Sequence, residues 1–271
     1  MHVTSSYFLC FIMNNNQKKQ WYKLTVSYDG TMYSGWQIQP DRPTIASEME
    51  QVYLRVFGYK IKLRGVSRTD AGVHAKGHVS FFYAPVVCTP DLLKYAWNNS
   101  LPSDICIKEV ALSQKIIHPH ALVDKKMYQY TFFQERPSPF VAKYGWYVVK
   151  KINNEKLKQV LSLFVGSHDF RFFCSADITG NTVKKIDNVD LVYNEELKAL
   201  SIVFEGKGFL RYMIRRLVGV AVQYATGDKI SLYDIKKMLA GSCDKAESYG
   251  FTAPAKGLSL CFIKFKEFKN E

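Results

Sequence analysis

A carboxylate and a guanidinium lie two residues apart in the segment SRTDAGVHAKGHVSFF, residues 67–82. If the backbone is extended here, Arg68 and Asp70 point to the same side and stand ~6.6 Å apart along the strand. A nearby cation stabilises an ionised carboxyl group, so we expect Asp70 to be charged at neutral pH. Such a carboxylate can act as a nucleophile or as a general base. The segment therefore indicates either an exposed charged turn or an active site.

The other residues of this segment narrow its chemistry. Gly72 permits a turn or a close backbone approach that a side chain would block. His74 and His78 have the four-residue spacing of a helical zinc pair, but on the strand predicted here they would lie ~13 Å apart, too far to share one metal. The glycines form neither G-x-G-x-x-G nor a phosphate-binding loop, so a nucleotide site is only weakly indicated.

The composition indicates a soluble globular protein with a polyanionic partner. The chain has 271 residues, and its 37 Lys and Arg exceed its 24 Asp and Glu, which gives a formal net charge of +13. An excess of this size favours nucleic acid or an anionic membrane face as the partner. The 18 Phe and 17 Tyr add aromatic rings, which suit unstacked bases.

The cysteines and the N-terminus indicate a cytoplasmic protein. The six cysteines are scattered and form no C-x-x-C pair, which argues against a structural zinc or a disulfide framework. The apolar residues 7–13 are too few to span a bilayer and lack the flanks of a signal peptide. We expect residues 1–20 to be an N-terminal extension, disordered or artefactual, with translation starting at Met1 or Met13.

Strands and helices alternate along the hydrophobic pattern. Strands are predicted at residues 21–28, 60–66, 77–83, 105–112, 125–133, 145–149, 183–193, 199–205 and 258–266. Helices are predicted at residues 44–57, 90–99, 154–165, 209–226 and 232–240, with Thr44 as the cap of the first. Proline in His118-Pro119-His120 interrupts the pattern and marks a seam. The pattern predicts an α+β fold with mainly antiparallel sheets, divided into an N-terminal domain, 21–117, and a C-terminal domain, 118–271.

Several motifs along the chain resemble one family. Residues 67–75 resemble the catalytic motif G-R-T-D-A-G-V-H-A of the tRNA pseudouridine synthase A (TruA) family, with Ser67 in place of the first glycine. Other segments resemble further motifs of this family and occur in the order in which the family has them. They are Tyr28–Thr31, Gly35–Gln37, Gln39–Pro40, Asn98–Pro102, Asp104–Ile105, Tyr128–Tyr130, Phe209–Arg215 and Ala253–Leu258. The order and spacing hold from Tyr22 to Phe265.

The resemblance implies a reaction that suits a single carboxylate. The family isomerises uridine to pseudouridine at positions 38, 39 and 40 in the anticodon stem-loop of tRNA. The base never leaves the site, so one ionised carboxylate can suffice, and the family needs no cofactor and no metal. Whether Asp70 attacks C1′, adds to C6 or deprotonates the sugar stays open. The implied fold is the pseudouridine synthase fold, two RRM/ferredoxin-like α/β halves flanking a central basic cleft.

The resemblance also implies roles for individual residues. Asp70 is the catalytic nucleophile, and Arg68 fills the space that the flipped base leaves, pairing with phosphate or with Asp70. Tyr128 stacks on the uracil and takes part in proton transfer. Arg211 is a partner of Asp70, and Leu258 packs against the uracil ring. Without the resemblance, Tyr128 would be a half-buried strand tyrosine, Arg211 would be part of a solvated basic face, and Leu258 would be a core leucine.

Basic residues elsewhere are candidates for binding tRNA. They are Lys125, Lys126, Lys184, Lys185, Arg215 and Arg216. In the predicted helix 209–226, Arg211 and Arg215 share one face. An apolar stripe of Met213, Leu217, Val220, Ala221 and Tyr224 faces the core. The chain departs from the family at His118-Pro119-His120, where H-A-R is common, and at Met127, which replaces a basic residue.

Two other functional classes remain open. A catalytically silent RNA-binding relative would keep the basic surface without needing Asp70. A nuclease would normally need a cluster of metal-binding carboxylates, and the sequence shows none. The resemblance further implies a homodimer in which one tRNA contacts both subunits.

Overall fold

A computed structural model describes residues 18–86, 88–114, 119–175, 177, 180–195, 197–228, 230–242 and 251–266. The chain divides into two compact units. The first comprises Met1–Ala71 and Ala75–Ala121, and the second comprises Gly72–His74 and Leu122–Glu271. His118 and most of the expected N-terminal extension lie outside the described residues, and Lys19 and Gln20 already belong to the first strand.

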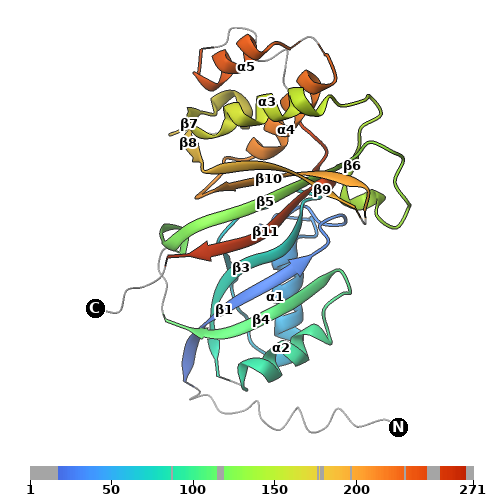
Figure 1. Ribbon diagram of the computed structural model, residues 1–271. Helices are drawn as coiled ribbons and strands as arrows, with labels where there is room; N and C mark the ends of the chain where they lie inside the picture. Colours follow the sequence, from blue (N-terminus) through green and yellow to red (C-terminus); the bar gives the residue numbers. More distant parts are fainter. Residues whose placement is uncertain are drawn as a thin grey trace. The chain divides into compact units, whose positions relative to one another are not determined.

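The first unit is an antiparallel sheet with two helices (Figure 1). Its elements are β1 (Lys19–Tyr28), α1 (Ile45–Phe57), β2 (Arg64–Gly65), β3 (His74–Pro85), α2 (Pro90–Asn98) and β4 (Ile105–Ser113). β1 lies between β3 and β4 and runs antiparallel to both, and the short β2 pairs with β3. β1 is therefore held by hydrogen bonds to one strand on each side, and its last residue is Tyr28.

Alternating apolar residues build the core of this unit. Every second residue of β1, from Tyr22 to Tyr28, is buried, as expected for a strand with one face on the core. The centroid of the Tyr53 ring on α1 lies 4.8 Å from that of the Trp97 ring on α2 and 5.7 Å from that of the Phe82 ring on β3. Both helices therefore cover one face of the sheet. Thr44 caps α1, as the sequence predicts.

The second unit contains a larger antiparallel sheet and three helices. Its strands are β5 (Val123–Phe133), β6 (Trp146–Tyr147), β7 (Gly166–Asp169), β8 (Val183–Ile186), β9 (Asn188–Asn194), β10 (Ala199–Gly206) and β11 (Leu258–Phe265). Its helices are α3 (Asn154–Phe164), α4 (Met213–Ala225) and α5 (Leu232–Leu239), with short 3-10 helices at Ala142–Tyr144, Arg171–Phe173 and Ala255–Gly257. A further 3-10 helix, Pro119–Leu122, begins in the first unit and ends in the second.

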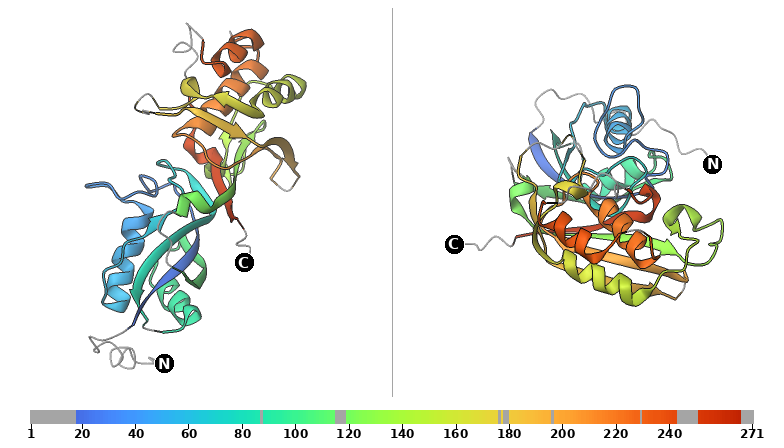
Figure 2. Two further views of the ribbon diagram at one scale, coloured as in Figure 1. Left: turned by 90° about the vertical axis from the view of Figure 1, so that its left-hand side faces the viewer. Right: turned by 90° about the horizontal axis from the view of Figure 1, so that it is seen from above.

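β5 lies at the centre of this sheet. It runs antiparallel to β11 on one side and to β10 on the other, β10 pairs with β9, and β6 adds a short parallel pairing. β7 and β8 form a separate two-stranded sheet. Figures 1 and 2 show α3, α4 and α5 gathered together on one side of the strands. The strand that carries Tyr128 is therefore held by hydrogen bonds along both edges.

The predicted α+β class with mainly antiparallel sheets is confirmed, and several boundaries are corrected. The strand predicted at 60–66 shortens to β2, because the Leu63 N–H binds the Glu50 carboxylate of α1, 2.8 Å away. The strand predicted at 183–193 divides into β8 and β9, which pair with different neighbours. β7 was not predicted. Across the described part of the chain, no helix has the length and apolar character needed to cross a membrane.

Candidate active site

The segment that carries Asp70 is not a regular strand. Residues 66–67 form a bend and residues 68–70 lie outside any strand, which corrects the extended conformation considered from sequence. Burial nevertheless alternates, because Ser67 and Thr69 are buried, Arg68 is exposed and Asp70 is half-buried. The guanidinium and the carboxylate therefore stay accessible while the two residues between and before them are fixed in the first unit.

Hydroxyl and amide groups of the first unit fix Thr69. The hydroxyls of Tyr28 and Thr69 lie 2.8 Å apart in a buried hydrogen bond. The Trp36 N–H donates to the Thr69 carbonyl oxygen at 3.2 Å. Gly35 makes this approach possible, because a Cβ there would lie 2.4 Å from the same oxygen. The residue next to Asp70 is therefore held at both its side chain and its carbonyl group.

Gly72 turns the chain after Asp70, as the sequence predicts. Its φ of +75° lies in the left-handed region that favours glycine, and β3 begins two residues later. The histidines of β3 do not pair with each other. His74 Nε2 lies 3.2 Å from the Lys256 carbonyl oxygen, and His78 Nε2 lies 2.8 Å from that of Ser67. Among the described residues, no three His, Cys, Asp or Glu side chains gather as metal ligands would.

The second unit brings Tyr128 and Leu258 together. Leu258 of β11 faces Tyr130 of β5 in the antiparallel register, so Tyr128 is its diagonal neighbour on the same face. Such neighbours lie ~7 Å apart, within reach of an aromatic side chain. Both side chains are largely buried. The Phe209 ring meets the Tyr128 ring edge-to-face at 5.4 Å, which brings the segment before Arg211 to the same aromatic residue.

Arg211 lies before α4 rather than inside it. Tyr212 has a φ of +65°, a left-handed conformation that an α-helix excludes, so the helix begins at Met213. The prediction that Arg211 and Arg215 share a helix face is therefore wrong. The predicted apolar stripe is buried except for Tyr224, whose hydroxyl donates to Gln159 at 3.0 Å.

Three contacts orient Arg211, and two of them come from the segment after β7. Its Nη1 pairs with Asp177 at 2.9 Å, its Nη2 donates to the Tyr212 hydroxyl at 3.1 Å, and its carbonyl oxygen accepts from the Ser175 N–H at 3.1 Å. The side chain is still 54% exposed. The guanidinium is therefore oriented while part of it can still reach a substrate.

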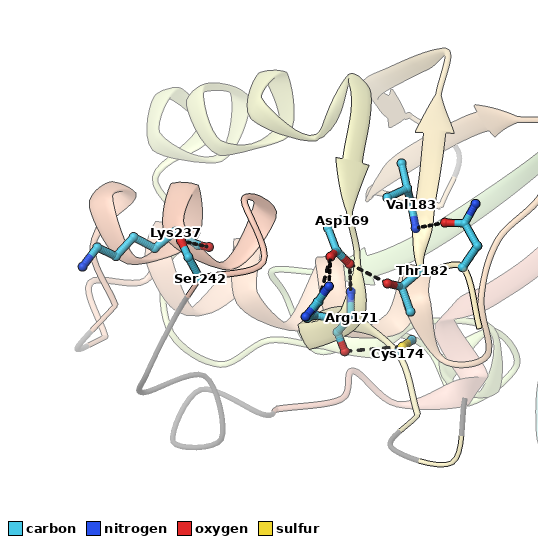
Figure 3. A network of polar contacts seen from close by, with 8 residues as sticks. Asp169, Arg171, Cys174, Thr182, Val183, Lys237 and Ser242 are labelled. Carbon is cyan, nitrogen blue, oxygen red and sulfur yellow. Dashed lines mark hydrogen bonds and ion pairs between the residues drawn. The ribbon is translucent and has the colours of Figure 1, made fainter. Parts of the chain in front are cut away.

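The same segment is anchored at Asp169 (Figure 3). The Asp169 carboxylate accepts from the Arg171 side chain and backbone and from the Thr182 hydroxyl. Burial opposes ionisation of this group, but these hydrogen bonds outweigh it and hold the pKa of the carboxyl below its usual value. The 3-10 helix 171–173 therefore starts from a fixed point, and Ser175 follows it.

The candidate tRNA-binding lysines differ in whether their charge is paired with a carboxylate or buried. Lys125 pairs with Glu205 at 2.8 Å, and Lys185 pairs with Asp187 at 3.0 Å. Lys126 is only 8% exposed, and burial lowers its pKa to about 8.

The arginines of α4 donate to backbone carbonyl groups. Arg215 Nε donates to Ala253, and Arg216 Nη1 donates to Cys174. Lys184 lies half-buried on β8. Candidates chosen by charge alone thus include residues that already serve the fold.

Sequence reasoning missed the groups that position the predicted site. Tyr28 and Trp36 belong to recognised motifs, yet their contacts with Thr69 join residues that lie 41 and 33 positions apart. Asp177 was missed because its contact with Arg211 spans 34 residues. The available signal was that Tyr28 ends the alternating stretch 21–28 and is followed by a segment with glycine at positions 30 and 35. No local pattern names its partner.

Comparison with known proteins assigns the family. A family model described as tRNA pseudouridine synthase matches residues 24–118 and 160–266. The tRNA pseudouridine synthase A of Thermodesulfovibrio yellowstonii is 35% identical over 248 residues, covering 88% of this chain and 96% of that protein. The corresponding protein of Acetivibrio thermocellus is 35% identical over 245 residues, covering 90% of this chain and 98% of its own length.

A third curated relative carries nearly the same name, whereas the solved structures are only remotely similar. The tRNA pseudouridine synthase A 1 of Protochlamydia amoebophila is 35% identical over 251 residues, with 90% of this chain and 96% of that protein covered. Among solved structures, a chain of an archaeal box H/ACA sRNP Nop10-Cbf5 complex aligns over 86% of this chain and 58% of its own, at 11% identity and a TM-score of 0.33, too low to support any argument. The family model matches well over half of the chain and the three curated relatives each cover 88% or 90% of it, so the chain belongs to the tRNA pseudouridine synthase A family.

Proposed function

We propose that this chain isomerises uridine to pseudouridine at positions 38, 39 and 40 of the anticodon stem-loop of tRNA, with Asp70 as the catalytic nucleophile. Membership of the family makes the chain an isomerase that forms pseudouridine. The anchoring of Ser67 and Thr69 carries the assignment of Asp70, because it fixes the backbone on which an accessible carboxylate sits next to an exposed arginine.

The reaction balances without any second reactant. The bond between ribose C1′ and uracil N1 breaks, C1′ bonds to C5, the hydrogen on C5 leaves, and N1 gains a hydrogen. A carboxylate can assist by bonding transiently to the substrate and departing unchanged, as nucleophilic catalysts do. Asp70 needs neither a second carboxylate nor an oxidant for this, because the base stays bound throughout and no leaving group has to be released.

The remaining site residues would act on the same uridine. Extracting a paired base costs a few kcal/mol of stacking and pairing energy, and Arg68 would occupy the vacated space. Tyr128 would stack on the uracil and take part in proton transfer, and Leu258, its diagonal neighbour on the sheet, would pack against the ring. Arg211 would pair with Asp70 through the part of its guanidinium that remains exposed.

The assembly we propose is a cytoplasmic, cofactor-free homodimer in which one tRNA contacts both subunits. The net charge of +13 supports a polyanionic substrate. Light scattering at micromolar concentration is expected to give twice the chain mass, and specific activity is expected to fall on dilution. A monomer with full specific activity at every dilution would exclude the dimer and leave the catalytic proposal intact.

Release of tritium from tRNA labelled at uracil C5 tests the reaction directly. We expect stoichiometric release with a chelator present, and pseudouridine at positions 38 to 40 of the product. Binding without release would instead identify a catalytically silent RNA-binding protein. Strand cleavage that the chelator abolishes would identify a nuclease.

A further inference from the structure

We propose that His78 is a positioning residue for Asp70, acting through the carbonyl group of Ser67. The proposal rests on the proposed catalytic role of Asp70. His78 lies on β3, whereas Ser67 lies in the segment that precedes this strand, eleven residues earlier. The sequence argues against a shared metal at His74 and His78, and in the structure each ring has a separate carbonyl partner.

The contact between His78 and Ser67 is short and fully buried. His78 Nε2 lies 2.8 Å from the Ser67 oxygen, and the histidine is 0% exposed. A carbonyl oxygen only accepts hydrogen bonds, so Nε2 carries the hydrogen and donates it. Water cannot replace this donor at a fully buried ring, and an unpaired buried carbonyl group is costly. The bond therefore restricts where the peptide before Arg68 can lie.

Trp36 joins this contact to the one at Thr69. Its ring stacks on the His78 ring with centroids 3.7 Å apart and planes 22° apart. Its backbone N–H donates to the Thr69 carbonyl oxygen. The carbonyl groups on either side of Arg68 are thus held by two residues whose rings pack against each other. Asp70 directly follows this doubly fixed stretch, so a shift of His78 would move the carboxylate.

Catalysis by one carboxylate makes such fixing valuable. A nucleophile must meet its target atom at ~3 to 3.5 Å in a defined direction, and misplacement by about 1 Å can cost a hundredfold in rate. A buried histidine that only filled space would need a hydrogen-bond partner too. A positioning role and a purely structural role differ in what loss of this bond does. If His78 positions Asp70 through Ser67, loss of the bond reduces turnover of correctly folded enzyme. If His78 is only structural, loss of the bond lowers stability alone.

Three substitutions of His78 test whether an N–H donor is needed and whether it must be long enough to reach the Ser67 oxygen. His78→Gln keeps an N–H donor long enough to reach the Ser67 oxygen. His78→Asn keeps the amide but is one carbon shorter, and His78→Leu removes the donor. We expect kcat, measured per folded enzyme by steady-state tritium release, to fall about 10- to 100-fold for Asn and Leu, with KM within about twofold of wild type. His78→Gln is expected to restore most of kcat.

Trp97→Phe is the matched control. It removes another buried ring N–H in the same unit, the donor to the Met49 carbonyl oxygen at 3.2 Å, without touching residues 67–70. We expect it to lower the melting temperature and leave kcat unchanged. If His78→Asn keeps full kcat, or if Trp97→Phe loses as much kcat as His78→Asn, His78 is not a positioning residue. Should His78→Leu fail to fold, the Asn and Gln variants decide.

The proposal can fail separately from the catalytic role of Asp70. Full activity of Asp70→Asn would remove the proposed function itself. An inactive Asp70→Asn combined with an undiminished kcat in His78→Asn would leave that function standing and overturn only the role of His78.

Discussion

The hydroxyl group of Tyr28, the last residue of β1, lies 2.8 Å from the hydroxyl group of Thr69, the residue before Asp70. β1 is hydrogen-bonded to β3 along one edge and to β4 along the other. The hydrogen bond therefore transfers the rigidity of the sheet to the segment that carries the proposed nucleophile.

Removing this hydroxyl is expected to slow turnover more than it weakens binding. Tyr28→Phe leaves the Thr69 hydroxyl unpaired at a buried position and costs about 1–3 kcal/mol of stability. We expect a kcat several-fold below wild type with unchanged tRNA affinity. A double-mutant cycle with Thr69→Val measures the coupling. If the two losses simply add, the hydroxyl pair does not position the segment.

Gly35 is expected to tolerate no side chain. Its φ is +93°, and a Cβ would lie 2.4 Å from the Thr69 oxygen, so Gly35→Ala must displace either its own loop or the segment that carries the proposed nucleophile. We expect lower thermal stability and at least a tenfold loss of kcat. Gly227→Ala is the control, because Gly227 also has a positive φ, +81°, but open space around it. Equal effects on kcat would mean that the close approach is unimportant.

Lys126 is expected to destabilise the fold at neutral pH. Its pKa falls from 10.5 to about 8 because burial disfavours the charged form. Between these two values the unfolded chain still binds the proton that the folded protein has lost, so stability rises with pH in this window. Lys126→Met should therefore be more stable at pH 7, by on the order of 3 kcal/mol. Chemical denaturation at pH 7 and pH 10 measures this gain, which must shrink as the pH rises.

Binding of tRNA is expected to weaken steeply with salt, because cations that neutralise phosphates release counterions. The effect of one lysine should depend on its existing partner. Lys125 already pairs with Glu205, so we expect Lys125→Gln to change the salt slope less than Lys184→Gln does. Filter binding between low and physiological salt measures both slopes. A flat wild-type affinity would contradict the electrostatic account.

The sequence predicted those features of the fold that depend on local pattern. The alternation in β1, the capping box at Thr44 and the turn at Gly72 are each set by a few neighbouring residues. The catalytic role of Asp70 also came from a local motif, and it stays a prediction. Boundaries failed where a distant group competed with the local preference, as Glu50 does for the Leu63 N–H.

The groups that orient the site could not be predicted, because their partners come from remote parts of the chain. The strand position of His78 was predicted, but its partner Ser67 lies eleven residues earlier in an irregular segment. Arg211 lies in an apparently helical pattern, yet the left-handed conformation of Tyr212 places it outside α4. Charge alone likewise gives no sign that the Lys126 side chain is buried, and its role in tRNA binding stays a prediction.

The most direct test of the account is single-turnover tritium release by Asp70→Asn, purified from cells lacking any other source of the activity. The substitution keeps the size and most of the polarity of the side chain but removes its charge. We predict that tRNA binding and the melting temperature stay close to wild type while release falls below detection. Appreciable turnover by this variant would contradict the assignment of Asp70 as the nucleophile.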